Sequence, residues 1–293
     1  MKCTDNRRFT LFWILLAILL VCLTAGVVII TIHVLTTRSL AESTPEPRPE
    51  SQTETPHQET GHGGAYYYAG MPVSTNYLHP FLVLTNIGYV AGYDDQRKNP
   101  AWVCYRLFVG TNHALPRTNL KFKVDPRTQA MVKQTDYRGS GYDRGHMAPN
   151  AAIAICYGTN AQLETFLMSN IIPQKPKLNQ QVWERLESDV VRYARKFTQV
   201  WVIDGPIFGV QTNTFQSGVQ VPGKCFKMIV METNGQPQVL AFIIPQDVAG
   251  SEQLAQFLTN VNTVETQTGL DFFSELPKAM QEKLESEVVK VMW

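Results

Sequence analysis

The residues best suited to chemistry in this sequence form one short run, Asp143-Arg144-Gly145-His146. Histidine can take a proton from water near neutral pH, so His146 is the natural general base. The planar guanidinium of Arg144 suits phosphate oxygens, and Asp143 can hold a ring, an arginine or a metal-bound water. Gly145 allows a substrate or the backbone to come close. The run alone is modest evidence, because a single histidine in a loop is more often structural than catalytic.

A second polar pair, Asn179 and Glu187, belongs to a predicted helix over 180–197 with apolar residues at a spacing of three to four. Asn179 stands at the start of this helix. Glu187 follows it by about two turns and lies slightly off the same face. An amide oxygen and a carboxylate acting through water are ligands that Mg²⁺ accepts. Taken alone, the segment is explained as simply by an N-cap at Asn179 and a solvated Glu187.

The strands and helices that must position these residues are mixed along the sequence and do not follow a repeating βαβ order. Strands rich in β-branched and aromatic residues are predicted at 102–109, 199–203, 225–232 and 239–244. Further helices are predicted at 252–266 and 277–291. The sequence shows no internal repeat and no glycine-rich phosphate loop followed by a helix. It therefore predicts an α+β fold with a largely antiparallel central sheet.

Composition divides the chain into four parts. Residues 10–37 contain no Asp, Glu, Lys or Arg, and about 20 apolar residues suffice to span a bilayer. We therefore expect a transmembrane signal anchor at 10–37, after a short cytoplasmic tail at 1–9. Residues 38–65 are rich in Pro, Glu, Thr and Gln, which predicts a flexible tether. Residues 66–293 form the expected folded domain.

The flanking charges predict the orientation of this anchor. Lys2, Arg7 and Arg8 precede the apolar segment, whereas Arg38 alone follows it closely. The positive-inside rule then places the N-terminus in the cytoplasm and the folded domain outside it, periplasmic or extracellular. Two alternatives stay open. One is a long signal peptide cleaved near 24–26 or 39–41, giving a secreted domain, and the other is an anchor in the mitochondrial inner membrane.

Charge and cysteine content exclude several classes of protein. A net charge of +1 excludes a protein that holds nucleic acid by bulk charge. The charge is uneven, however: residues 85–150 contain ten Lys or Arg and five Asp or Glu, which is weak support for a polyanion site. Cys104, Cys156 and Cys225 form no zinc-binding spacing, and we predict no required disulfide.

The two polar groups together closely resemble the signature of the DNA/RNA non-specific endonuclease family, the ββα-metal nucleases that include the Serratia nuclease and endonuclease G. That signature is Asp-Arg-Gly-His, followed some thirty residues later by Asn and then by Glu eight positions on. The resemblance covers about residues 70–277. It extends to the runs Asn99–Trp102, Gly205–Phe208, Phe226-Lys227, Ala241–Pro245 and Val264–Phe273.

The resemblance implies a ββα-metal nuclease fold and a role for each matching residue. His146 would be the general base, and Asn179 the one direct protein ligand of Mg²⁺, for which Mn²⁺ could substitute. Asp143 and Glu187 would orient His146 and metal-bound waters, and Arg144 would contact the phosphate. Arg117 is the best placement for an auxiliary phosphate-binding arginine. The family's basic residue after the glutamate has no match here, because position 191 is Val and Arg192 comes one step later.

The function implied is Mg²⁺-dependent hydrolysis of DNA and RNA to 5′-phosphate products, with His146 activating water. The alternative is a catalytically silent nuclease fold that binds nucleic acid or protein while tethered to a membrane. Expected partners are DNA and RNA as substrates and the membrane through the N-terminal helix. A homodimer and a protein inhibitor are left open.

Overall fold

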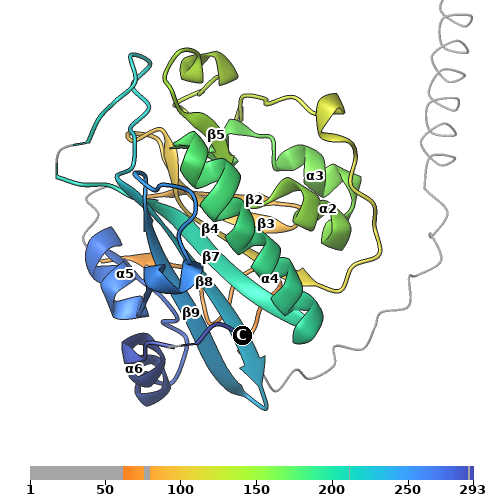
Figure 1. Ribbon diagram of the computed structural model, residues 1–293, viewed down its shortest axis with the longest axis vertical. Coiled ribbons are helices and arrows are strands. Elements are labelled where there is room, and N and C mark those ends of the chain that lie inside the picture. Colours follow the sequence, from red (N-terminus) through yellow and green to blue (C-terminus); the bar gives the residue numbers. More distant parts are fainter. Residues whose placement is uncertain (1–61, 76–79, 211, 290) are drawn as a thin grey trace, which may run out of the picture. The chain divides into compact units, whose positions relative to one another are not determined.

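A seven-stranded antiparallel sheet forms the centre of the molecule in the computed structural model, which describes residues 62–75, 80–210, 212–289 and 291–293. The strand order is β10-β9-β8-β7-β4-β3-β2. Helix α4 lies across the sheet, and α5 and α6 lie at its other side (Figure 1). Two further two-stranded pairs, β1–β11 and β5–β6, complete the strands of the described residues.

The strands are β1 (Val73–Ser74), β2 (Leu82–Asn86), β3 (Tyr89–Asp94), β4 (Asn99–Phe108), β5 (Asp143–His146), β6 (Ile171–Gln174), β7 (Gln199–Ile207), β8 (Lys224–Thr233), β9 (Gln236–Pro245), β10 (Leu258–Thr259) and β11 (Leu270–Asp271). The helices are α2 (Asn150–Tyr157), α3 (Thr159–Glu164), α4 (Glu184–Lys196), α5 (Val261–Thr268) and α6 (Lys278–Ser286). A π-helical segment, Leu178–Trp183, leads directly into α4.

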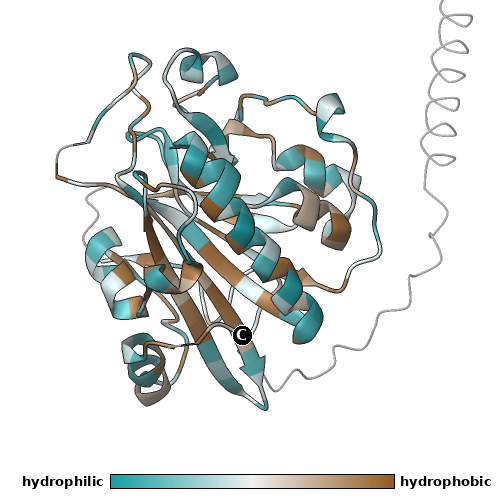
Figure 2. Ribbon diagram, in the orientation of Figure 1, coloured by the Kyte–Doolittle hydropathy of each residue, from teal (hydrophilic) through white to brown (hydrophobic). Residues whose placement is uncertain are grey.

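Both faces of the sheet are buried, and alternation along each strand decides which core a side chain enters. On β7, Val202 faces the core beneath α2, α3 and α4, whereas Trp201 and Ile203 face the core that contains α5 and α6. On β8, Ile229 and Met228 divide in the same way. Figure 2 shows the apolar residues concentrated along these strands and the polar residues on the outer side of α4.

The predicted α+β fold with an antiparallel sheet is confirmed, and all four predicted strands are present with longer bounds. The prediction of one helix over 252–266 is wrong. Asn260 ends the preceding segment by accepting the N–H of Thr263 through Oδ1 at 2.9 Å, which caps α5. The residues before it form a short 3-10 helix and strand β10.

The helix predicted over 277–291 is also shorter than expected, because α6 ends at Ser286. Beyond it, Val289, Met292 and Trp293 pack against the core beneath α4. The ring of Trp293 lies 5.4 Å from those of Tyr193 and Phe197. Burial of these apolar side chains outweighs continuation of an exposed helix.

The predicted tail, anchor and most of the predicted tether, residues 1–61, lie outside the described residues. Within the part of the chain that the structure describes, no helix has the length and apolar character needed to cross a membrane.

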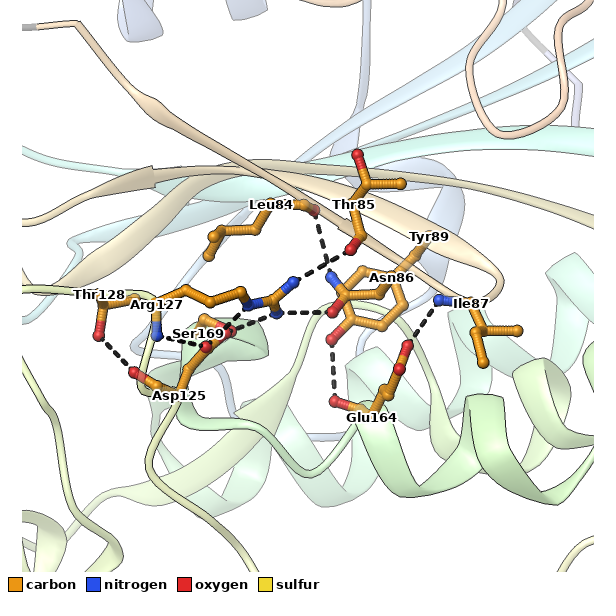
Figure 3. A network of polar contacts seen from close by, with 10 residues as sticks. All are labelled: Leu84, Thr85, Asn86, Ile87, Tyr89, Asp125, Arg127, Thr128, Glu164 and Ser169. Carbon is orange, nitrogen blue, oxygen red and sulfur yellow. Dashed lines mark hydrogen bonds and ion pairs between the residues drawn. The ribbon is translucent and has the colours of Figure 1, made fainter. Parts of the chain in front are cut away.

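A polar network fastens the long segment after β4 to the β2–β3 turn (Figure 3). Arg127 donates through Nε and Nη2 to both oxygens of Asp125, at 2.9 and 2.7 Å, and through Nη2 to Asn86 at 2.7 Å. Ser169 donates to the same carboxylate at 2.6 Å. Burial of Asp125 opposes its charge, but these hydrogen bonds prevail and lower its pKa. The segment that follows β4 is thereby held in one position.

A fully buried ion pair lies on the sheet face covered by α4. Asp204 on β7 and Lys227 on β8 are direct cross-strand partners and are both 0% exposed. The ammonium of Lys227 also donates to the hydroxyl of Tyr105 at 3.0 Å and lies 4.4 Å from the ring of Trp183. Burial raises the pKa of Asp204 to about 6, although Lys227 opposes the shift. Each of these two buried charges is stabilised by the other.

Replacing one partner of this pair should lower the free energy of unfolding more than replacing both partners. We expect Asp204→Ala to lower the free energy of unfolding by about 3–5 kcal/mol, because Lys227 is left as an uncompensated buried charge. The double variant Asp204→Ala/Lys227→Met should recover part of that loss. Urea unfolding of the wild type, the single variants Asp204→Ala and Lys227→Met and the double variant measures the effect. A double variant whose loss equals the sum of the single losses would contradict this account.

Candidate active site

The Asp143–His146 run forms strand β5 and not the loop expected for its histidine. It pairs antiparallel with β6, so that Asp143 lies opposite Gln174 and His146 opposite Ile171. Because side chains alternate along a strand, Arg144 and His146 share one face and Asp143 and Gly145 share the other. The motif therefore presents two different environments on its two faces.

His146 packs against two neighbouring aromatic rings that sequence reasoning did not identify. Its ring centroid is 4.9 Å from that of Phe166 and 5.4 Å from that of Phe122. Nε2 is shielded from solvent and has no hydrogen-bond partner within the described residues. Burial, followed by the charges of Arg117 and Arg144, lowers the pKa of His146 to about 3. The imidazole is therefore neutral at physiological pH, which is the form that can accept a proton.

Arg117 and Arg144, far apart in sequence, meet over Phe122. Their guanidinium carbons lie 5.2 and 4.8 Å from its ring centroid, and Arg117 also lies 4.5 Å from the ring of Phe166. Partial desolvation and the charge of Arg144 lower the pKa of Arg117. None of the ion pairs found in the described part of the chain includes either arginine. Two guanidinium groups beside a neutral histidine form a place suited to an anion.

On the other face of β5, Asp143 joins the helix that follows β6. Its Oδ2 accepts from Nδ2 of Asn179 at 3.0 Å and from Nε2 of Gln180 at 2.7 Å. Asn179 is not an N-cap, because it lies inside the π-helical segment and its N–H donates to the carbonyl of Lys175 at 2.9 Å. Gln180 is a contact that the motif did not indicate.

The π-helical segment changes the relation between Asn179 and Glu187. In a regular α-helix, eight residues overshoot two full turns by about 80°. A π-helix rotates less per residue, so the segment Leu178–Trp183 reduces that overshoot and brings the two residues closer to one face. Helical segments of this kind are frequent at functional sites.

Glu187 lies close enough to the buried ion pair for both charges of the pair to affect the pKa of its carboxyl group. Burial raises its pKa to about 7, with Lys227 lowering it and Asp204 raising it. Among the described residues, no hydrogen bond or ion pair joins His146 to Asp143, Asn179 or Glu187. The structure thus joins Asp143 to Asn179 and Arg117 to Arg144 and His146, and it leaves Glu187 in a third environment.

Gly145 allows close approach of a neighbouring side chain, whereas the sequence predicted close approach of a substrate or of the backbone. A Cβ at this position would lie 2.0 Å from Oε1 of Gln174, the buried neighbour on β6.

Asn170, just before β6, fixes the chain that follows His146. Its side-chain oxygen accepts the N–H of Ala148 at 2.9 Å, and its side-chain nitrogen donates to the carbonyl of Ala148 at 3.0 Å. Arg192, the basic residue that follows Glu187 in the sequence, forms an ion pair with Asp189 at 3.0 Å and donates a hydrogen bond to the carbonyl of Trp293.

The donor set around Asp143 fits a hard divalent cation. Asn179 uses its nitrogen toward Asp143, which leaves its carbonyl oxygen available as a ligand. Carboxylate and amide oxygens are the ligands that Mg²⁺ and Mn²⁺ accept, usually together with several waters. The residues on this face of β5 therefore suit such an ion, whereas the neighbours identified around the His146 ring are Phe122, Phe166, Arg117 and Arg144.

The raised pKa of Glu187 predicts that replacing this residue stabilises the protein by an amount that depends on pH. The folded protein holds the Glu187 proton more tightly than the unfolded chain, so the wild type loses stability as pH rises from about 4.5 through 7. Glu187→Gln lacks this loss. We expect the melting temperature of Glu187→Gln to exceed that of the wild type by more at pH 8 than at pH 5, in EDTA. A difference independent of pH would contradict the assignment.

Comparison with known proteins gives consistent matches. The model of the DNA/RNA non-specific endonuclease family matches residues 75–279. The mitochondrial nuclease EXOG of Xenopus laevis is 33% identical over 210 residues, covering 66% of this chain and 58% of that protein. Human mitochondrial endonuclease G is 32% identical over 203 residues, covering 63% of this chain and 67% of that protein.

A chain of the solved EndoG/EndoGI complex, a structure concerned with EndoG inhibition, superposes with a TM-score of 0.63. It is 29% identical and covers 69% of this chain and 90% of its own length. The chain spans somewhat more than half the length of the first curated relatives that it matches. With the family model covering most of the sheet, β5, the π-helical segment and α4, the chain belongs to the DNA/RNA non-specific endonuclease family.

Proposed function

We propose that this protein is a Mg²⁺-dependent endonuclease that hydrolyses phosphodiester bonds of both DNA and RNA and leaves 5′-phosphate products. The observation that carries the proposal is the neutral His146 held beside the guanidinium groups of Arg117 and Arg144. A base next to two phosphate-binding groups is the arrangement that hydrolysis of a phosphodiester requires. Family membership and nuclease-named relatives support the same reaction class.

In the proposed reaction Arg144 and Arg117 bind the non-bridging oxygens of the scissile phosphate. His146 takes a proton from a water molecule, whose oxygen attacks phosphorus in line with the bond to the 3′-oxygen. The new P–O bond forms as the P–O3′ bond breaks, and the departing 3′-oxygen takes up a proton from solvent. Because water and not a ribose hydroxyl attacks, the chemistry does not depend on the sugar.

Asn179 would hold the metal directly, with Asp143 fixing the orientation of its side-chain amide. When bound, Mg²⁺ supplies neutralisation of the charge that develops on the phosphate. Glu187 would act from the same helix on water near the ion. Phosphate contacts carry no base information, so weak sequence preference is expected.

The rival proposal, a silent nuclease fold that only binds nucleic acid or protein, lacks a supporting feature among the described residues. A silent fold has no requirement for a neutral histidine beside two arginines or for an amide oriented by a carboxylate. The two proposals separate experimentally, because a silent fold binds without cleaving.

We further propose that the apolar segment 10–37 anchors the protein in a membrane with residues 66–293 on the far side. The support is the uncharged length of the segment and the three basic residues before it. Several matched relatives carry names that place them in mitochondria. These names favour a mitochondrial location among those considered.

Substitution of His146 tests the base directly. We expect His146→Ala in the full-length chain, purified in detergent, to cut supercoiled plasmid and single-stranded RNA at least about 10²-fold more slowly in Mg²⁺. The exposed His113 gives a matched control, and His113→Ala should cleave at the wild-type rate. Circular dichroism and thermal unfolding verify that both variants fold. Wild-type cleavage by a folded His146→Ala protein would exclude this role.

Salt dependence tests the role assigned to Arg117. Removing one phosphate-binding side chain should reduce the slope of log affinity against log salt concentration by about 0.7–0.9. We expect Arg117→Ala to show this reduction in binding to a DNA duplex, measured in Ca²⁺ to suppress cleavage. Arg192→Ala, an exposed arginine already paired with Asp189, is the control and should leave the slope unchanged. Equal slopes for Arg117→Ala and the wild type would remove Arg117 from the site.

A further inference from the structure

Three carboxylates converge in a part of the molecule that the proposed nuclease chemistry does not use. Glu265 lies on α5, Asp271 on β11 and Glu285 on α6. One oxygen from each residue lies within 4.8 Å of the others. The three groups come from separate elements, so the tertiary structure alone brings them together.

No cationic side chain within the described residues compensates this charge through an ion pair. The ion pairs found there include none of the three carboxylates. Their hydrogen-bond donors are neutral: the N–H of Phe272 donates to Oε1 of Glu265 at 2.9 Å, and Nε2 of Gln281 donates to Oδ1 of Asp271 at 3.2 Å. Like charges at this separation repel one another unless a cation or a proton intervenes.

Glu285 supplies an independent indication of a missing partner. Its side chain faces this cluster while only 7% of the residue is exposed, and its Oε1 is buried without a hydrogen-bond partner in the part of the chain that the structure describes. A buried carboxylate oxygen without a partner is costly. Burial raises the pKa of Glu285 to about 7; Gln281 opposes this shift, whereas the charges of Glu265 and Asp271 add to it.

We propose that Glu265, Asp271 and Glu285 bind a Ca²⁺ ion that fastens α6 to α5 and β11. Carboxylate oxygens are the ligands that Ca²⁺ prefers, at about 2.3–2.6 Å and in flexible geometry. Two such bonds span up to about 5 Å, which accommodates oxygens that lie within 4.8 Å of one another.

This site is separate from the one formed around β5. Glu285 lies beyond residue 279, where the match to the family model ends. The α6 helix has few other polar ties to the described part of the domain: its Gln281 reaches Asp271 and Phe272, and the carbonyl of Ser286 accepts from Asn260 at 3.3 Å. A bound cation would therefore stabilise the attachment of α6, whatever reaction the protein catalyses.

The test uses the full-length chain carrying Asn179→Ala, so that the proposed catalytic ligand is absent. The protein is purified in detergent, stripped with EDTA and dialysed before titration with CaCl₂ at pH 8. We expect calorimetry to show one bound Ca²⁺ and a saturable rise in melting temperature. Adding Glu285→Gln should weaken binding at least about tenfold, because one charged ligand is removed. Gln preserves the shape and removes repulsion, so this variant should stay folded.

Glu282→Gln provides the matched control, since Glu282 is an exposed carboxylate on the same helix outside the cluster. It should bind Ca²⁺ as the Asn179→Ala protein does. Absence of saturable binding would overturn the proposal, as would equal binding by the Glu285→Gln protein. If acidification to pH 5 raised the melting temperature while CaCl₂ had no effect, a shared proton would occupy the place assigned to Ca²⁺, and the proposal would fail.

Discussion

The ion pair between Asp204 and Lys227 constrains the structure more than any other single interaction described above. The antiparallel register of β7 and β8 places the two side chains opposite each other on the face beneath α4. Each charge is stabilised there by the other and by the hydroxyl of Tyr105, and Lys227 also lies against the ring of Trp183. Trp183, at the end of the π-helical segment that leads into α4, contacts Lys227 and so connects the pair to the segments that carry Asn179 and Glu187.

The same ion pair affects the candidate site because its two charges influence the pKa of Glu187. Burial raises the pKa of Glu187 overall, while Lys227 favours its carboxylate and Asp204 opposes it. His146 is likewise kept neutral by burial and by two nearby guanidinium groups. Ionising either group costs free energy in the folded protein, and pKa values perturbed in this way are common at functional sites.

A short strand separates the two halves of this site. One face of β5 presents His146 with its cationic and aromatic neighbours, and the other presents Asp143, whose carboxylate accepts hydrogen bonds from the π-helical segment. The Asp125–Arg127 network holds the segment on which Phe122 stands, since Asp125 follows Phe122 closely in sequence (Figure 3). Rigid support on both sides leaves the polar groups of the site preorganised.

The sequence by itself determined four of the seven strands of the sheet and the antiparallel α+β class, because strand composition and helical periodicity are local properties. Only the tertiary structure decided the rest. Three features of the site depend on how distant segments pack. They are the π-helical turn, the close approach of Gln174 to Gly145, and the packing of Phe122 and Phe166 against His146. The carboxylate cluster at Glu285 likewise joins three separate elements, and local sequence patterns carry no record of contacts made across such distances.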